Sequence, residues 1–271
     1  MMEIMGYIAA LFIGISLGLI GGGGSILTVP VLVYLFGINP VVATSYSLFV
    51  VGSTSLVGAF NNHRKGLVQI KTALLFGLSS ITTVFLTRKL LMPLIPEHIG
   101  TIGNIDITES IITMVLFAIL MVAASLFMIK GKKEQPRETG LKQEIKQEKI
   151  NLPKLLFFGV AIGVATGLLG AGGGFLLIPT LVLLVKLPMK DAVGTSLLII
   201  ALNSLIGFTG DIGHFAIDWF FLFKVTFIAI AGIFAGGLLN KKIEGDKLKK
   251  GFGWFVLVMG IYILSKEIFF T

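Results

Sequence analysis

The chain has 271 residues, of which 55% are hydrophobic and only 13% are charged, and its mean hydropathy is +0.97. A soluble globular domain carries about 25% charged residues, so this composition excludes a soluble protein and predicts an integral membrane protein. The absence of cysteine excludes disulfides and thiolate metal sites, and three histidines leave little for a metal or acid–base centre. We therefore expect no enzyme activity, no metal and no cofactor.

The basic residues that give the chain its net charge of +8 cluster in short loops between apolar blocks. In a soluble protein this charge would suggest nucleic acid, but here it is typical of cytoplasmic loops that face anionic lipid. We expect the lipid bilayer as a partner, and no nucleic acid. The N-terminus lacks the basic region of a signal peptide, so we interpret it as the first membrane segment of the mature protein.

Apolar blocks of about the length that crosses a bilayer follow one another along the chain. The first and fifth blocks have about 33 residues each, which is too long for one crossing, and a glycine run cuts each of them into two pieces. The blocks run roughly over 4–36, 41–60, 67–92, 107–129, 154–185, 192–210, 219–239 and 251–270.

The charges of the loops predict the orientation of these blocks. The loops at 131–153 and 240–250 are rich in lysine and belong in the cytoplasm, whereas the loop at 211–218 has no lysine or arginine and belongs outside. The fifth block then starts and ends inside, and the first block starts and ends outside, so each enters the membrane and returns as a hairpin. Arg88 and Lys89, at the outer end of the third block, are the misfit in this scheme.

Each half of the chain therefore contains a broken-helix hairpin and three crossings, and the halves have opposite orientations. We predict an all-α membrane protein with an inverted-topology repeat, as in many secondary transporters. The first repeat covers 1–130, a charged cytoplasmic linker covers 131–153, and the second, inverted repeat covers 154–271. Similar residues in the two halves support this organisation: VATS at 42–45 and VGTS at 193–196, Ser53 and Ser204, and His63 and His214.

The glycine runs, GLIGGGGSILTVP at 18–30 and GLLGAGGGFLLIP at 167–179, form the bends of the hairpins. Hydrocarbon offers the backbone no hydrogen-bond partner, so these bends must be buried in protein or line a wet cavity. The helix piece after each bend begins with unpaired N–H groups at the positive end of its dipole, which can hold an anion without a buried lysine or arginine. We predict that the bends meet near the midplane and form an anion site. The alternative is that the glycines serve only close helix packing.

Hydroxyl and amide side chains of the second and sixth blocks offer neutral donors that could complete this site. Each hydroxyl could equally bond back to a carbonyl of its own helix. His63 and His214 could be gates or proton acceptors, although a histidine at a block end is more often an interfacial residue. The predicted binding residues are Gly21, Gly22, Gly23, Gly24, Ser25, Thr44, Ser45, Ser53, Gly170, Gly172, Gly173, Gly174, Thr195, Ser196, Asn203 and Ser204.

The duplicated G-L-[IL]-G-x-G-G-[GS] run with its following proline, the Thr-Ser pair, and the histidine after the next block together resemble the TauE/SafE (sulfite exporter, TSUP) family. The resemblance covers nearly the whole chain. It implies a multi-pass transporter of the bacterial plasma membrane, mostly an exporter, for sulfur-containing anions such as sulfite, sulfoacetate and other organosulfonates.

We therefore expect a secondary transporter that works by alternating access, through rocking of the two repeats around a midplane site, with both termini outside. An anion channel of the same architecture and a non-transporting membrane scaffold subunit are the alternatives. The exact substrate, the direction of transport and the coupling ion are not fixed by the sequence. A homo-oligomer is compatible with it.

The predicted orientation can be tested with single cysteines, because the chain contains none. We expect Ala216→Cys to react with a membrane-impermeant maleimide in intact cells, and Lys142→Cys to react only after the membrane is permeabilised. The cysteine-free chain is the control for background labelling. Labelling of Lys142→Cys in intact cells would contradict the assignment of 131–153 to the cytoplasm.

Overall fold

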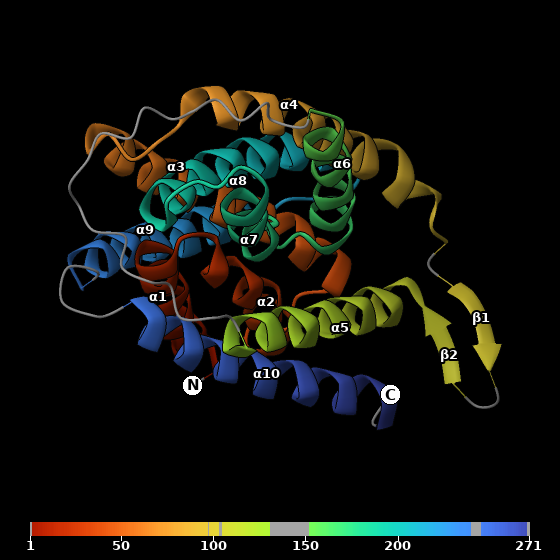
Figure 1. Cartoon of the computed structure of the whole chain (residues 1–271). Helices are drawn as coiled ribbons and strands as arrows, with labels where there is room; N and C mark the ends of the chain where they lie inside the picture. Colours follow the sequence, from red (N-terminus) through yellow and green to blue (C-terminus); the bar gives the residue numbers. More distant parts are fainter. Residues whose placement is uncertain (1, 97, 103–104, 131–151, 240–244, 270–271) are drawn as a thin grey trace.

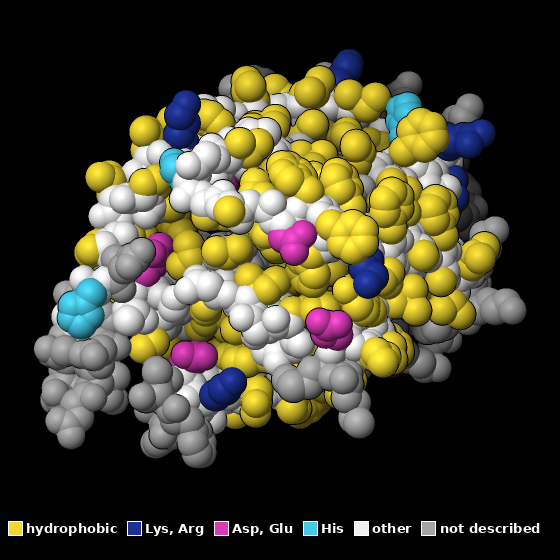
Figure 2. Space-filling model, turned by 180° about the vertical axis from the view of Figure 1, so that it is seen from behind, with side chains coloured by type: hydrophobic (Ala, Val, Ile, Leu, Met, Phe, Trp, Pro, Cys, Tyr) yellow, Lys and Arg dark blue, Asp and Glu magenta, His cyan; other side chains and the backbone are white. Residues whose placement is uncertain are grey.

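A computed structural model describes the chain apart from residues 1, 97, 103–104, 131–151, 240–244 and 270–271 (Figure 1). The described part is built mainly of helices, and six of them are long and apolar enough to cross a membrane. Hydrophobic side chains cover most of the face seen in Figure 2, as expected of a surface that contacts lipid. The prediction of an all-α membrane protein is confirmed, with one short β-hairpin as an unexpected addition.

The first half begins with a hairpin and continues with three long helices. Asn39 starts the first of these helices, because its side chain accepts a hydrogen bond of 2.9 Å from the N–H of Val41 and proline follows it. The elements are α1 (Met2–Ile20), the 3-10 turn η1 (Gly22–Leu27), α2 (Thr28–Tyr34), α3 (Pro40–Arg64), α4 (Ile70–Leu86), the π-helical turn η2 (Thr87–Leu91), the 3-10 turn η3 (Met92–Leu94), the antiparallel strands β1 (His98–Ile102) and β2 (Ile105–Thr108), and α5 (Glu109–Lys130).

The second half has a matching order of α-helices, and its described residues contain no β-strand. The predicted linker at 131–153 lies outside the described residues, except for its last two residues, which begin the first helix of this half. The elements are α6 (Leu152–Leu169), α7 (Gly174–Leu184), α8 (Met189–Asp211), α9 (Trp219–Leu239) and α10 (Gly245–Phe269).

The helices of the two halves pack against each other in a matching pattern. Helix α3 packs on α8 and α5 on α10, while α1 packs on α9 and α6 on α4. Figure 1 shows the second of these pairs as the two long helices at the bottom of the molecule. If each helix is replaced by its counterpart in the other half, the pairs α3–α8 and α5–α10 are unchanged, and the pair α1–α9 becomes α6–α4. The packing therefore has an internal two-fold repeat.

Individual contacts within this packing repeat with a constant shift along the chain. A Cβ atom added to Gly58 of α3 would approach the side chains of Ile233 on α9 and Leu197 on α8. A Cβ atom added to Gly207 of α8 would approach the side chains of Val84 on α4 and Leu48 on α3. In every case the residue in the second half carries the number of its counterpart plus 149. The two triads are Gly58, Ile233 and Leu197, and Gly207, Val84 and Leu48.

This shift corrects the pairing suggested by sequence similarity, which was two residues longer. A shift of two residues rotates a position around the helix axis by roughly 200°. The similar tetrapeptides at 42–45 and 193–196 therefore do not mark equivalent positions. His214 corresponds to Lys65 rather than to His63. Likewise, Ser204 corresponds to Ser55 and not to Ser53.

Glycines allow α1 and α9 to pack at backbone distance. A Cβ atom at Gly14 would overlap the carbonyl oxygen of Ala229, and one at Gly232 would overlap that of Leu11. Small residues are typical of helix contacts in membranes, where lipid is as apolar as leucine and close packing supplies the attraction. This contact joins the first hairpin to the second half.

We expect Gly232→Val to lower the free energy of unfolding by about 3 kcal/mol, because the valine would force α1 away from α9. Thermal unfolding of the purified protein in detergent measures the change. Gly77→Ala is the matched control, since a Cβ at this helical glycine would meet only Ile81, at 3.5 Å. Equal stability of the two variants would contradict the close contact.

Candidate functional site

The bends of the two hairpins touch each other through their backbones. A Cβ atom at Gly22 would overlap the Cα of Gly174, and a Cβ at Gly174 would overlap the Cα of Gly22. No side chain fits between them. The two bends therefore meet, and each covers part of the other's polar backbone.

Four glycines of the bends are required by backbone conformation, because side chains disfavour a positive φ. Gly21 has a φ of 75°, and Gly170, Gly172 and Gly173 have values of 66°, 66° and 67°. Gly22, Gly24 and Gly174 are required because neighbouring atoms leave no room for a Cβ atom. The surroundings of Gly23 lie outside the described residues. Packing and conformation thus account for most of each glycine run.

The two bends differ in how their backbone groups are used. The first continues directly into the 3-10 turn η1, where the hydroxyl of Ser25 donates a hydrogen bond of 2.7 Å to the carbonyl of Gly22. In the second bend, α7 starts directly at Gly174. The N–H groups of Leu176 and Leu177 both donate to the carbonyl of Gly173, at 3.0 Å, so the backbone donors left for a ligand at this bend are the N–H groups before Leu176.

Helices α3 and α8 lie directly over the bends. A Cβ atom at Gly170 would overlap the backbone of Thr44, and one at Gly21 would come within 2.9 Å of Val193. Ser204 also contacts the second bend, because a Cβ at Gly172 would lie 3.1 Å from its Oγ. The structure thus brings the two blocks rich in hydroxyl groups onto the glycine bends.

Several predicted hydroxyl groups already have hydrogen-bond partners. Thr44 donates to the carbonyl of Val41 at 2.7 Å, and Ser196 donates to that of Val193 at 2.9 Å. Thr195 accepts a bond of 3.0 Å from the N–H of Gln69 at the start of α4. Their hydroxyls serve helix structure, and Ser53 is only partly buried.

Three other predicted side chains are fully buried and retain unused polar atoms. Within the described residues, the hydroxyl of Ser204 and the amide nitrogen of Asn203 have no hydrogen-bond partner, although the amide oxygen of Asn203 accepts a bond of 2.9 Å from Ser80. The hydroxyl of Ser45 faces the carboxylate of Asp211 without forming a hydrogen bond of ordinary geometry. These side chains can still bind a ligand.

Two further hydroxyl groups at the bends were missed by the sequence analysis. Ser16 on α1 lies against Gly24, and Thr166 on α6 lies against Gly173. Both hydroxyls are buried and have no hydrogen-bond partner in the part of the chain that the structure describes. In each half the hydroxyl residue precedes the glycine run by one helical turn or slightly more, and this spacing is the signal that could have identified them.

Two cavities lie at opposite ends of α3 and α8. The Arg88 cavity has a volume of about 910 Å³, and the Lys65 cavity has a volume of about 40 Å³. The Arg88 cavity is lined by the first turn of α3, the end of α8 and the residues between α4 and α5, including Asn39, Val42, Arg88, His98, Glu109, Asp211 and His214. The Lys65 cavity is lined by Gly18, Asn61, Asn62, Lys65, Val193, Phe234 and Gly237, among others.

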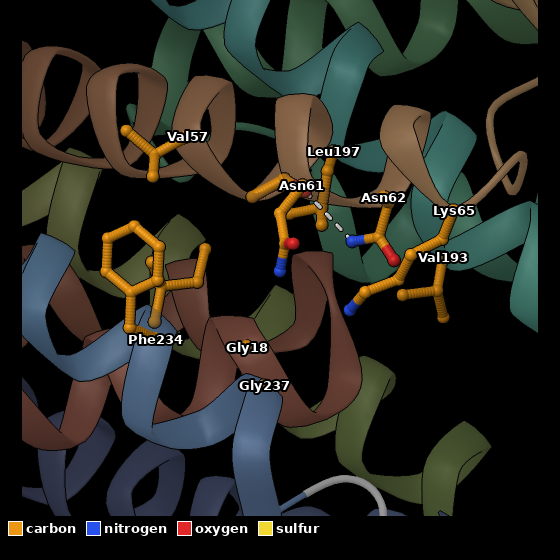
Figure 3. A pocket seen from close by; sticks show the side chains of 11 residues that line it. Gly18, Val57, Asn61, Asn62, Lys65, Val193, Leu197, Phe234 and Gly237 are labelled. Carbon is orange, nitrogen blue, oxygen red and sulfur yellow. Dashed lines mark hydrogen bonds between the residues drawn. The ribbon is translucent and has the colours of Figure 1, made fainter.

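The Lys65 cavity is polar on the side of α3. Figure 3 shows the side chains of Asn61, Asn62 and Lys65 directed into it from one helix, with Phe234 and Gly237 of α9 on the opposite side. Asn62 also donates a hydrogen bond of 2.9 Å to the carbonyl of Gly58. The Lys65 cavity adjoins the first bend, because Val193 both lines this cavity and contacts Gly21. The lining of the Arg88 cavity reaches Val42, two residues before Thr44, which contacts the second bend.

The two cavities occupy equivalent places in the internal repeat but differ in chemistry. The shift of 149 residues relates Asp211 to Asn62 and His214 to Lys65. It also relates Arg88 to Gly237. The Arg88 cavity therefore contains a buried ion pair, with a distance of 3.2 Å between Arg88 Nη1 and Asp211 Oδ2, where the Lys65 cavity has an amide and a glycine.

The two histidines proposed as gates have different surroundings. His214 is exposed, lines the Arg88 cavity and interacts electrostatically with Asp211. His63 is exposed near the end of α3 and is not among the residues that line either cavity. Within the described part of the chain, no group of three or more His, Asp and Glu side chains could hold a metal ion.

Comparison with known proteins places the chain among membrane transporters. Residues 7–263 match the family model described as Sulfite exporter TauE/SafE. A "Probable membrane transporter protein" of Xylella fastidiosa (strain 9a5c) is 29% identical over 262 residues, which cover 94% of this chain and 92% of that protein. The "Probable membrane transporter protein YunE" of Bacillus subtilis (strain 168) is 26% identical over 98% of this chain and its own whole length. No solved structure matches.

The contact between the bends predicts that Gly22→Ala and Gly174→Ala are coupled. Each variant should lose about 1–3 kcal/mol of stability, because a methyl group cannot fit between the two backbones. The double variant should lose at least about 0.5 kcal/mol less than the sum, since either methyl group already separates the bends. Thermal or denaturant unfolding in detergent measures this cycle. The pair Gly22→Ala and Gly77→Ala should be additive, and equal coupling in both pairs would contradict the contact.

Proposed function

The chain belongs to the sulfite exporter TauE/SafE family, and on that premise we propose that it is a secondary transporter of a small sulfur-containing oxyanion. Sulfite, sulfoacetate and other organosulfonates are the candidate substrates, and the bacterial plasma membrane is the expected location. The observation that carries the proposal is the meeting of two glycine bends between two cavities at opposite ends of α3 and α8. This is the arrangement that a carrier needs around a central binding site.

The substrate would bind where the second bend meets α3 and α8. The N–H groups at the start of α7 and the hydroxyls of Thr166 and Ser204, which lie against Gly173 and Gly172, would supply neutral hydrogen bonds there. The amide nitrogen of Asn203, next to Ser204 on α8, would be a further donor. The oxygens of a sulfonate or sulfite accept such bonds, and a helix N-terminus favours their negative charge. An anion held in this way would bind firmly enough to be selected and loosely enough to leave.

The unequal cavities support alternating access. The Arg88 cavity, of about 910 Å³, has room for a small anion and its water, whereas the Lys65 cavity, of about 40 Å³, has room for only a few water molecules. A site open at one end and closed at the other favours a carrier over a channel. Rocking of the two repeats would open the closed end and close the open one.

The loop charges favour an orientation in which the Lys65 cavity faces the cytoplasm and both termini lie outside. Arg88, the misfit of the sequence analysis, is compatible with this orientation, because its charge is buried against Asp211 and is not part of an exposed loop. Lys89 remains as one exposed cation at the outer end.

We expect sulfite or sulfoacetate at millimolar concentration to raise the Tm of the purified protein by several degrees, because a ligand that binds only the folded state stabilises it. Alanine and glucose, which carry no net charge, are the controls. In proteoliposomes the flux of the stabilising anion should saturate with concentration. The proposal fails if neither sulfonates nor sulfite bind while unrelated solutes do, and single-channel currents would indicate the channel instead.

A further inference from the structure

We propose that Arg88 is an oxyanion-binding residue in the Arg88 cavity, which the anion reaches before the second glycine bend, and that the anion shares or replaces Asp211 as its partner. The proposal deepens the proposed function, on which it rests for the identity of the transported anion. It assigns a role to the one arginine that the orientation of the blocks left unexplained.

The guanidinium of Arg88 is buried and only partly paired. The side chains of Arg88 and Asp211 are 1% and 4% exposed, and a single contact of 3.2 Å joins Nη1 of the arginine to the carboxylate. Among the residues that the structure describes, Nε and Nη2 of Arg88 have no hydrogen-bond partner. Buried polar groups are nearly always hydrogen-bonded, so two unused charged donors in one side chain indicate a missing acceptor.

The unused atoms have the geometry of an oxyanion site. Nε and Nη2 form the side edge of the guanidinium, which carries two parallel N–H bonds, and such an edge pairs with two oxygens of one carboxylate, phosphate or sulfonate group. Asp211 occupies the other side of the guanidinium and fixes its plane. A chloride ion cannot accept both bonds in this geometry as well as an oxyanion can.

The chain displays Arg88 in an uncommon local structure. Arg88 lies in the π-helical turn η2, between α4 and η3, and such turns occur frequently at functional sites. Gly210 of α8 makes room for the side chain, because a Cβ atom there would lie 3.0 Å from Cβ of Arg88. The counterpart of Arg88 in the second half is Gly237, so the arginine belongs to one end of the transporter only.

A short path connects Arg88 to the second bend. Arg88 and Asp211 both line the wide cavity. The hydroxyl of Ser45 faces Asp211, and the preceding residue, Thr44, lies against Gly170 of the bend. Asp211 therefore connects the cavity to the part of α3 that lies against the bend.

The charged groups around Arg88 keep its charge balanced in the absence of an anion. Asp211 contacts it, Glu109 acts on it at longer range, and His98 and His214 line the same cavity. An arriving anion must compete with the two carboxylates, which limits its affinity. This suits a site that passes the anion on to the bend.

Three variants of the full-length protein test the proposal. Arg88→Lys retains the charge but loses the side edge with two parallel donors. Arg88→Met combined with Asp211→Leu removes both members of the pair, so that no buried charge remains alone. Lys89→Met is the matched control, because Lys89 is the adjacent residue of the same turn, is exposed, and places its ammonium 5.4 Å from the centre of the Phe85 ring. Titration calorimetry with sulfite, sulfoacetate and chloride measures binding, and thermal unfolding checks the fold.

We expect Arg88→Lys and the double variant to bind sulfite and sulfoacetate at least 10-fold more weakly than the unaltered chain, and Lys89→Met to bind within 2-fold of it. Chloride should bind weakly to all of them. Oxyanion binding by Arg88→Lys, or by a folded double variant, within 2-fold of the unaltered chain would overturn the inference and leave the proposed function standing. If the double variant does not fold, Arg88→Lys decides. Failure of the unaltered chain to bind any of these oxyanions would overturn both proposals.

Discussion

Two stretches of bare backbone in contact, at Gly22 and Gly174, are the constraint on which the rest of the structure depends. A hairpin that turns inside a membrane exposes polar N–H and C=O groups that lipid cannot satisfy. Here each bend covers the other, and α3 and α8 close over both. The small residues between α1 and α9 follow from the same requirement, since the hairpins must come close enough for their bends to meet.

Much of the architecture follows from local signals in the sequence. The length of the apolar blocks predicts the membrane helices, and the glycine runs predict the bends, because both depend on only a few neighbouring residues. Helices α1 and α2, and likewise α6 and α7, meet at the glycines as expected. The short strands β1 and β2 were missed, and the alternation of apolar and polar residues in them was the signal that could have identified them.

The details of the candidate site depend on contacts between distant residues and could not be predicted. Arg88 looked like a misplaced loop charge because its partner, Asp211, is 123 residues away. The equivalence of Lys65 and His214 was missed because similar tetrapeptides suggested a shift two residues too long. For the hydroxyl groups, the sequence left binding and helix bonding open; Thr44 and Ser196 bond within their own helices, and Ser204 has no hydrogen-bond partner.

On the proposed alternating access, the constant shift between the halves predicts a second arrangement of the same chain, in which each half would take on the contacts of the other. Asn62 and Gly237 would then line the wide cavity, and Arg88 and Asp211 would be sealed in the narrow one. A space of about 40 Å³, which holds only a few water molecules, would leave little room for an anion beside the guanidinium. Closing that end of the protein would therefore also displace the bound anion from Arg88, in the same movement.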